Sequence, residues 1–459
     1  MDSIMVARRW PRLQLGLLGP YVIAWRRMLD TSMPLPAFHP YWWEAAPLVE
    51  LPKQPVPERA DTVMVGAGFA GLSAALTLAR AGRAVAVFDK DRPGEGASSR
   101  NGGIASGNIK IRFSKMIESF GLARAKAIYE EAKRARADLA RFVKEEGIDC
   151  CFAPSGHFTG AVRPAHYEAM AREAELMNKH LGCGAYMVPR SEQHGEIGTD
   201  FYYGGMVKPD IGGLHPGLLH TGMLERVQAA GATIHARTSV SGVRRDNDAF
   251  EVHTAHGRLR ARHVVVATNG YTGSATPWLQ RRIVPIPSQI ITTEPLDPAL
   301  MDRLMPKRRM IGESRNLYHY YRPSPDGTRM VFGGRRGAET NDPKAKFRQL
   351  YRDLGEIFGE LDGVSITHSW WGYTGYTFDY LPKVAVHEGV HYATGFCGSG
   401  VVWARWLGQK VALRILGDAE AETVFDETPF QTRPLYRGRP WFLPAIIGWY
   451  RIKDRCGIT

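Results

Sequence analysis

Three glycines early in the chain have the spacing of a dinucleotide-binding loop. Gly66, Gly68 and Gly71 form the pattern GxGxxG directly after a short apolar run that predicts a strand (residues 61–65) and at the start of a run of helical spacing (residues 67–80). The first glycine allows a tight turn, the second lets the backbone approach a pyrophosphate, and the third lets the helix pack against the strand. The start of that helix then faces the phosphate charge.

An acidic residue at the expected distance completes this loop. The apolar run 84–88 predicts a second strand, and Asp89 ends it, 23 positions after Gly66. A carboxylate at this place accepts hydrogen bonds from ribose hydroxyls and repels a 2′-phosphate. Two buried parallel strands around one helix predict a right-handed βαβ unit that binds a nucleotide.

The choice between FAD and NAD depends on a motif much further along the chain. The valine-rich run 264–267 leads into a Thr-Asn-Gly turn at 268–270, after a stretch of strand-like segments. An NAD-binding domain usually completes its sheet without such a detour, whereas flavoproteins of the glutathione-reductase type insert a domain and return with such a strand. The pattern favours FAD, and an NAD-dependent dehydrogenase is the alternative.

Composition and charge narrow the class of protein. The chain has 459 residues, a length that suggests two or three domains, and 44% of them are hydrophobic. It contains no run of 18 apolar residues, so we expect no membrane-spanning helix. Lys and Arg exceed Asp and Glu by 13, but they are spread along the chain without the motif of a nucleic-acid-binding module. The five cysteines include no CxxC pair, so we expect no metal site, no disulfide framework and a reducing, cytoplasmic location.

The order of predicted elements indicates an α/β fold. We expect an FAD-binding Rossmann-like domain of the glutathione-reductase type, interleaved with an α+β substrate domain built on a mixed or antiparallel sheet. The alternation of apolar and polar residues at 283–334 predicts that second sheet. The expected division is 1–59 as N-terminal extension and linker, 60–162, 205–280 and 365–420 as FAD-binding domain, 163–204 and 281–364 as substrate domain, and 421–459 as C-terminal tail.

The first 45 residues do not belong to this pattern. Three arginines, Arg8, Arg9 and Arg12, precede an apolar run at 13–24, but no small-residue cleavage site of a secretory signal follows. We favour a disordered extension, or a start codon at Met28 or Met33. A basic helix at a membrane interface is the alternative, which we do not expect.

Further motifs follow the glycine-rich loop in a characteristic order. They are residues 96–103 (GASSRNGG), 213–216 (GLHP), 264–270, 318–334 and 395–400 (GFCGSG). Together with the loop and Asp89, they give a chain that resembles the D-amino-acid oxidase superfamily of FAD enzymes over residues 60–416. Within it the chain looks most like the γ-glutamylputrescine oxidase and glycine/sarcosine oxidase branch, mostly through residues 99–103.

The resemblance implies how FAD is bound. The position that matches a tethering Cys in some relatives is Trp370 or Trp371, and residues 98–100 hold no His, so we expect noncovalent FAD. Residues 98–103 would lie beside the flavin, Val240 would pair with adenine through its backbone, and the helix after 395–400 would stabilise negative charge near flavin N1 and C2=O. The predicted cofactor-binding residues are Gly66, Gly68, Phe69, Ala70, Gly71, Asp89, Lys90, Ala97, Ser98, Ser99, Arg100, Asn101, Gly102, Gly103, Val240, Ala267, Thr268, Gly395, Phe396, Gly398, Ser399, Gly400 and Val401.

The implied reaction is oxidation of the C–N bond of a primary or secondary amine, such as an amino-acid derivative or a polyamine adduct like γ-glutamylputrescine. Hydride passes to flavin N5 and water hydrolyses the imine, so the protein mainly orients and desolvates the amine. No side chain is predicted to be catalytic. Aromatic rings can hold the amine as a cation, and the candidate pocket residues are Tyr318, Tyr320, Trp371, Tyr373 and Tyr376, with Trp370, Tyr321 and Phe378 also considered.

Other polar residues leave alternatives open. We interpret His215 as a structural hydrogen-bonding residue rather than a base. Arg322, Arg335 and Arg336 could bind a substrate carboxylate, but none of them has a secure match to the arginine that does so in the family. Residues 331–334 lack the Lys that promotes oxygen use in sarcosine oxidase-like enzymes, so the acceptor is oxygen or, for a dehydrogenase, another compound. A basic, nucleotide-stabilised protein without activity, binding nucleic acid or membrane, is the alternative from another class. The oligomeric state is not predicted.

Overall fold

A computed structural model describes residues 34–335, 343–426 and 428–457. The chain divides into two units, Met1–Leu35 and Pro36–Thr459. Only Pro34 and Leu35 of the first unit are described, so the predictions made for the basic and apolar N-terminal segment, and for Arg336, lie outside the described residues. The fold below is that of the second unit.

The first sheet has eight strands and a parallel centre. Its order is β17 (Lys383–His387), β18 (Val390–Thr394), β11 (Gly257–Val266), β1 (Arg59–Val65), β2 (Val85–Phe88) and β8 (Thr233–His235), and the antiparallel strands β10 (Ala249–Thr254) and β9 (Val240–Asp246) continue from β11. Strand β1 pairs in parallel with both β11 and β2. Its last four residues are buried, as expected for a strand covered on both faces.

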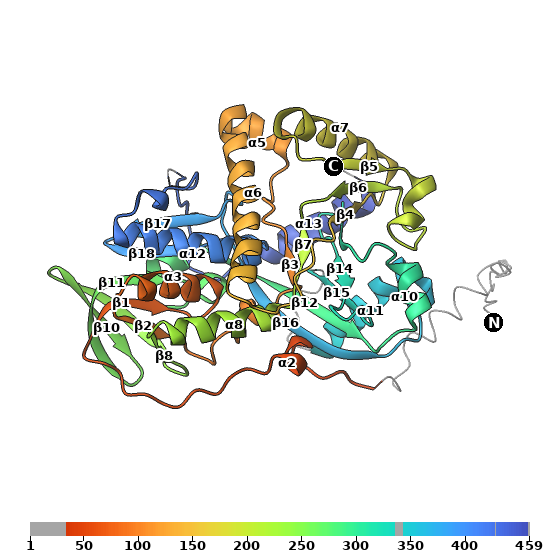
Figure 1. The fold of residues 1–459 in the computed structure, drawn as a ribbon. Coiled ribbons are helices and arrows are strands. Elements are labelled where there is room, and N and C mark those ends of the chain that lie inside the picture. The colour runs from red at the N-terminus through yellow and green to blue at the C-terminus, as the bar shows by residue number, and fades with distance from the viewer. Residues whose placement is uncertain (1–33, 336–342, 427, 458–459) are drawn as a thin grey trace, which may run out of the picture. The chain divides into compact units, whose positions relative to one another are not determined.

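Helices on one side of this sheet contribute the largest hydrophobic core. They are α3 (Phe69–Arg80), α6 (Leu122–Glu145), α8 (Pro216–Ala229) and α12 (Gly400–Leu416) (Figure 1). Helices α3 and α12 approach closely, because a Cβ atom on Gly408 would lie 2.3 Å from the Ala70 carbonyl oxygen. The Ser73 hydroxyl also donates to the Arg405 carbonyl at 2.6 Å.

The second sheet is mixed and mostly antiparallel. Its order is β16 (Ile366–Tyr376), β12 (Val284–Thr293), β15 (Met330–Gly334), β14 (Tyr320–Pro323), β13 (Met310–Glu313), β4 (His157–Gly160), β6 (Gly205–Lys208) and β5 (Tyr186–Val188). Only the β13–β4 pair is parallel among these described strands. Helices α7 (Pro164–Leu181), α10 (Pro298–Leu304) and α11 (Pro343–Ile357) belong to this part of the chain (Figure 1).

Short elements connect the two sheets. Strands β3 (Ile104–Ala105) and β7 (Gly212–Gly213) form a small pair. The remaining helices are α2 (Trp42–Ala45), α4 (Ala97–Arg100), α5 (Phe113–Phe120), α9 (Pro277–Gln280) and α13 (Leu443–Cys456), with 3₁₀ turns η1 (Arg190–Gly195), η2 (Asn269–Tyr271), η3 (Gly359–Leu361) and η4 (Ala419–Ala421). No helix in the described ranges is both long and apolar enough to cross a bilayer.

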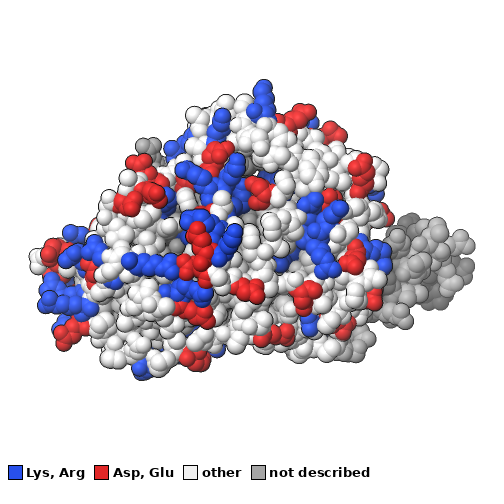
Figure 2. Space-filling view, in the orientation of Figure 1, with Lys and Arg blue, Asp and Glu red and all other residues white. Residues whose placement is uncertain are grey.

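The predicted α/β fold with a mixed second sheet is confirmed. Some strands pair differently from the predicted segments: β4, β6 and β16 lie in ranges expected to belong to the FAD-binding domain, yet all three pair in the second sheet. Strand partners are set by contacts between distant segments, which local periodicity does not report. The division into domains therefore stays a prediction. On the face shown in Figure 2, Lys and Arg side chains are interspersed with Asp and Glu.

A buried ion-pair network holds β13, β14 and α11 together. Arg315 donates two hydrogen bonds of 2.6 Å to the Glu313 carboxylate, and His319 lies between Glu313 and Asp353. Burial raises the pKa of Glu313, but the charges of His319 and Arg315 outweigh it and hold that pKa at about 2. The stabilisation from the Glu313 carboxylate is thus complete above its ordinary pKa of 4.5 and is lost as the pH falls toward 2.

Replacing Glu313 by Gln should lower the free energy of unfolding at pH 7 by about 3–5 kcal/mol, because Arg315 then loses its paired carboxylate and Asp353 is left as the one carboxylate beside His319. Urea denaturation measures the difference. In the matched variant Glu118→Gln the lost carboxylate is 63% exposed beside Lys115, and the change should stay below about 1 kcal/mol. Similar losses in the two variants would show that the network does not stabilise the fold.

Candidate active site

A large cavity lies between the glycine-rich end of the first sheet and one face of the second. Its volume is about 1120 Å³, and its walls include Gly66 and Asp89 at one end and Tyr318, Arg335 and Tyr376 at the other. Pockets for one small ligand usually measure roughly 300–1000 Å³. The space is therefore sufficient for a dinucleotide together with a small second molecule.

The glycine-rich loop has the geometry that its sequence predicts. Gly66 adopts a φ of +108°, and a Cβ atom on Gly71 would lie 1.9 Å from the Gly66 carbonyl oxygen, so the helix start packs directly on the turn. A Cβ atom on Gly68 would lie 2.8 Å from Ser98 Oγ, which accepts a hydrogen bond from the Phe69 N–H at 2.9 Å. The first turn of α3 is thereby tied to helix α4.

Two polar side chains hold the loop from either side. The Asp89 carboxylate accepts from the N–H groups of Ala67 at 2.8 Å and Asp91 at 3.0 Å. Burial raises the pKa of Asp89 to about 6, with these two hydrogen bonds acting in the opposite direction. On the other side, His220 Nε2 lies 2.8 Å from the Ala67 carbonyl oxygen, and burial lowers the pKa of His220 to about 4, so the neutral ring donates.

Three indole groups fix the loop at residues 96–103, which sequence reasoning did not find. Trp42 donates to the Asn101 carbonyl at 2.8 Å, Trp43 to Ser99 Oγ at 2.9 Å, and Trp370 to the Arg100 carbonyl at 2.8 Å. Trp42 and Trp43 belong to helix α2, in a region predicted only as linker. No motif signals this role, because the contact joins segments that lie far apart in the chain.

Arg322 and His215 make hydrogen bonds that hold the backbone in place. For His215 this is the structural role that its sequence position predicts. One Arg322 nitrogen donates to the carbonyls of Gly103 and Leu214, both at 2.9 Å, and the side chain is buried. His215 begins helix α8, where its Nδ1 accepts from the Leu218 N–H at 3.1 Å. Neither residue lines the cavity.

The loop at residues 395–400 reaches the cavity from the other edge of the parallel strands. Asn269 Oδ1 accepts from the Gly395 N–H at 2.9 Å and so joins the end of β11 to this loop. The Ser399 hydroxyl donates to the Asn108 carbonyl at 2.7 Å. Gly400 and Val401, at the first turn of α12, line the cavity, so the positive end of that helix dipole faces it.

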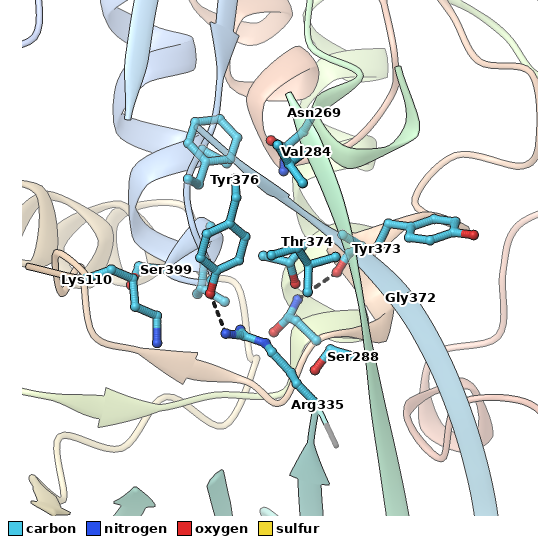
Figure 3. Close-up of a pocket in the computed structure, with 18 of the residues that line it drawn as sticks. Lys110, Asn269, Val284, Ser288, Arg335, Gly372, Tyr373, Thr374, Tyr376 and Ser399 are labelled. Atoms are coloured by element: carbon cyan, nitrogen blue, oxygen red, sulfur yellow. Dashed lines mark hydrogen bonds between the residues drawn. The ribbon is translucent and has the colours of Figure 1, made fainter. Parts of the chain in front are cut away.

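Two cations and two tyrosines line the far end of the cavity, and Figure 3 shows three of them, Lys110, Arg335 and Tyr376. The Lys110 ammonium donates to the Tyr318 hydroxyl, and Arg335 donates to the Tyr376 hydroxyl. This cluster packs on the loop at residues 395–400, because a Cβ atom on Gly398 would lie 2.8 Å from an Arg335 nitrogen and 3.8 Å from Lys110 Cε. We call Lys110, Tyr318, Arg335 and Tyr376 the cation cluster.

The cluster alters the acid–base behaviour of its members. Burial raises the pKa of Tyr318, but the positive charges of Arg335 and Lys110 outweigh it and bring that pKa down to about 8. Loss of solvation within the cavity lowers the pKa of Lys110, and burial raises that of Tyr376. Nearby, the hydroxyl groups of Tyr320 and Ser288 lie 2.9 Å apart and also face the cavity.

Most of the predicted cofactor residues line the cavity. Those that do are Gly66, Gly68, Phe69, Ala70, Asp89, Lys90, Ala97, Ser98, Arg100, Asn101, Gly102, Val240, Ala267, Thr268, Phe396, Gly398, Ser399, Gly400 and Val401. Gly71, Ser99, Gly103 and Gly395 lie behind this wall, where they make the packing contacts on which the wall depends. A motif marks positions that need small residues, but it does not separate lining residues from supporting ones.

The aromatic candidates divide in the same way. Tyr318, Tyr320, Tyr373, Tyr376 and Phe378 line the cavity. Trp371 does not, contrary to the sequence prediction: its side chain is 41% exposed and packs edge-on against the ring of Tyr373. Trp370 and Tyr321 are buried outside the cavity as well. Tyr373 extends away from Arg335 and Tyr376 (Figure 3), and its ring packs edge-on against Tyr271.

Replacing Asp89 by Ala should weaken binding of the predicted FAD by roughly 10- to 100-fold, because two loop N–H groups lose a charged acceptor and the ribose loses its partner. Fluorescence titration of the apoprotein with FAD measures the dissociation constant. The exposed Asp302, which pairs with Arg308, provides the control variant Asp302→Asn. Equal affinity in the Asp89 variant and the wild type would exclude this role.

Comparisons with known proteins agree with this geometry. Residues 61–414 match the family described as FAD dependent oxidoreductase (DAO). The chain is 29% identical over 427 residues to the "Probable oxidoreductase OrdL" of Rhizobium meliloti, covering 90% of this chain and 97% of that protein. It is 28% identical over 403 residues to the "Gamma-glutamylputrescine oxidoreductase" of Escherichia coli, covering 87% and 93%.

Solved structures share the fold. The crystal structure of glycine oxidase from Geobacillus kaustophilus aligns with a TM-score of 0.70 at 21% identity, covering 82% of this chain and 99% of that one. The L-proline dehydrogenase from P. horikoshii aligns with a TM-score of 0.65 at 22% identity, covering 85% and 99%. The superfamily and the cofactor predicted from the sequence are confirmed: the chain belongs to the DAO family of FAD-dependent oxidoreductases.

Proposed function

We propose that this protein oxidises the C–N bond of a primary or secondary amine that also carries a carboxylate, with FAD as the hydride acceptor. The observation that carries the proposal is the cation cluster. Lys110 and Arg335 both line the cavity, where each donates to a tyrosine hydroxyl, and neither forms an ion pair with an Asp or Glu of the described residues.

Two cations held close together repel each other unless a negative charge lies beside them. The groups that act on Arg335 are the tyrosines 318, 376 and 320, and those that act on Lys110 include Tyr318, Arg335 and Cys397. Phenols satisfy the N–H donors but supply no full negative charge while they are protonated. A ligand with a carboxylate would supply that charge, and an arginine offers it a planar, two-pronged donor group.

The walls beside the cluster suit the amine end of such a substrate. Val284, Ile286 and Ile290 on β12 supply apolar surface, and the Tyr320 and Ser288 hydroxyls supply a small polar patch. Apolar walls favour the neutral amine over its ammonium form, because desolvation disfavours the charged state. The chain thus anchors the substrate by its acid group and helps the amine to lose its proton.

The other end of the cavity suits FAD. The pyrophosphate would be held by backbone N–H groups at the start of α3, and the ribose by the Asp89 carboxylate. The start of α12 would face the part of the flavin ring system that becomes negative. When bound, the flavin supplies the hydride acceptor. The contact of Gly398 with Arg335 then brings the carboxylate anchor next to the loop that the resemblance assigns to the flavin.

The names of relatives support an amine that carries a carboxylate. Besides the gamma-glutamylputrescine oxidoreductase, they include a glycine oxidase of Bacillus licheniformis at 22% identity and an N-methyl-L-tryptophan oxidase of Escherichia coli at 23% identity. Glycine and N-methyl-L-tryptophan both combine an amine with a carboxylate. These names do not identify the electron acceptor. Residues 331–334 lack the Lys that promotes oxygen use in sarcosine oxidase-like enzymes, but Lys110 brings an ammonium group to the same cavity, so oxygen stays a candidate.

Anaerobic titration of the purified protein with pairs of amines, each amino acid beside its decarboxylated counterpart, tests the proposal. We expect the flavin absorbance to bleach with the acid and not with its counterpart. A flavin that stays oxidised with every amine, yet is reduced by alcohols or NADH, would refute amine oxidation.

Mixing the reduced enzyme with oxygen or with a quinone then identifies the acceptor. Acid precipitation that leaves FAD in the supernatant would confirm the predicted noncovalent binding.

Replacing Arg335 by Gln should raise KM for a carboxylate-bearing amine by roughly 10- to 100-fold, since a charge-assisted hydrogen bond is worth about 1.5–3 kcal/mol. The KM for the decarboxylated counterpart should change little, and steady-state kinetics on the pair measures both. The control variant is Arg303→Gln, because this arginine is exposed and pairs with Glu360. A loss of the same size for both substrates would contradict a carboxylate-specific role.

The pH dependence should report on Tyr318. Its phenol is neutral below its pKa of about 8 and becomes a phenolate above it, which offsets the charge of Lys110 and Arg335. We therefore expect KM for the carboxylate-bearing substrate to rise above pH 8 in the wild type. In Tyr318→Phe, which cannot ionise, this rise of KM should vanish. The pH dependence of kcat that comes from deprotonation of the substrate amine should persist. An unchanged KM profile in the variant would assign the ionisation to another group.

A further inference from the structure

We propose that the outer face of helix α13 docks on the surface of an anionic lipid bilayer. This inference goes beyond the proposed reaction and does not depend on it. It starts from an apolar stripe on the helix that points away from the protein core. The stripe consists of Ala445, Trp449 and Ile452, spaced four and three residues apart along one side of the helix, together with Trp441 in the turn just before it.

The helix is firmly attached through its opposite face, so the stripe is not the result of a loose end. Leu443 and Ile447 form a buried cluster with Leu317. The Asp454 carboxylate accepts from the N–H groups of Asn316 at 2.8 Å and Leu317 at 3.1 Å. Leu443, Ile447 and Tyr450 also line the cavity, so α13 is a wall between the cavity and the surface.

Its outer side exposes large apolar groups. Trp441 is 63% exposed, and Trp449 and Ile452 are each 52% exposed. Leu435, in the segment before the helix, is 84% exposed. A soluble surface seldom gathers several large apolar side chains in one place unless they bind something. Tryptophan is favoured where one side of a molecule is apolar and the other wet, as at a membrane interface.

Charge indicates what the stripe would bind. Residues 433–455 contain six cationic side chains and only one acidic residue, Asp454, whose carboxylate is taken up by the backbone of Asn316 and Leu317. The cations are Arg433, Arg437, Arg439, Arg451, Lys453 and Arg455. Cations beside an apolar stripe with tryptophans are the pattern of helices that lie in the plane of a membrane and contact anionic head groups.

The same charges argue against two other occupants. In a two-fold dimer formed through the stripe, the cations of one copy would lie near those of the other. The N-terminal residues 1–33 carry five arginines and two aspartates, so as a cover for the stripe they would bring like charge to it. A negatively charged lipid surface is the occupant that complements both the apolar stripe and its cations.

Sedimentation with lipid vesicles tests the inference on the full-length protein with FAD bound. We expect binding to vesicles of phosphatidylcholine mixed with phosphatidylglycerol, weaker binding as salt is raised, and little binding to phosphatidylcholine alone. The double variant Trp449→Ser/Ile452→Ser should lower the partition coefficient at least about tenfold, because it removes the inserted apolar groups. The matched variant Leu122→Ser/Val386→Ser, with exposed apolar residues elsewhere, should bind like the wild type.

A second variant covers the case in which the first loses FAD or fails to fold. Arg437→Gln/Arg439→Gln leaves the helix unchanged and should weaken binding to the anionic vesicles several-fold. Three results would overturn the inference: no vesicle binding by the wild type, binding that neither variant reduces, or a dimer in sedimentation velocity that the Trp449/Ile452 variant converts to monomer. The last result would identify the stripe as an interface between copies of this chain.

Discussion

Close backbone packing around the start of helix α3 is the constraint on which the rest of the structure depends. The Gly71 position sits against the Gly66 carbonyl, and the Gly408 position against the Ala70 carbonyl, with no room for a side chain at either place. These contacts bring β1, α3 and α12 together so that two helix starts face one cavity. Any larger residue would push the helices apart and remove the cradle for the pyrophosphate.

The opposite end of the cavity depends on charge rather than on close packing. Lys110 and Arg335 reach it from different segments, and the described residues give them tyrosine hydroxyls as hydrogen-bond acceptors but no carboxylate. Such an arrangement is unfavourable for folding alone. The loss of folding stability is offset when an anionic substrate binds beside the two cations, and sites of function often reduce stability in this way.

Residues outside the recognised motifs determine whether the motifs are in place. The indole groups of Trp42, Trp43 and Trp370 hold three successive positions of the loop at 99–101, and Asn269 joins the two loops at the ends of β11 and β18. Trp42 and Trp43 were not predicted to have a role, and Trp370 and Asn269 were singled out for other reasons. Each acts through one or two hydrogen bonds to a segment distant in the chain, and so few polar contacts leave no periodic pattern in a sequence.

The sequence by itself determined the class of fold, the cofactor and most of the residues that line its side of the cavity. It could do so because GxGxxG, Asp89 and the loop at 395–400 impose local requirements, such as a tight turn or a place without a Cβ atom, that only certain residues meet. The tertiary structure alone decided that β4, β6 and β16 join the second sheet, that Trp371 lies outside the cavity lining, and that Lys110 and Arg335 both approach Gly398. Those outcomes depend on strand pairing and register between distant segments, where a shift of one residue turns a side chain to the other face.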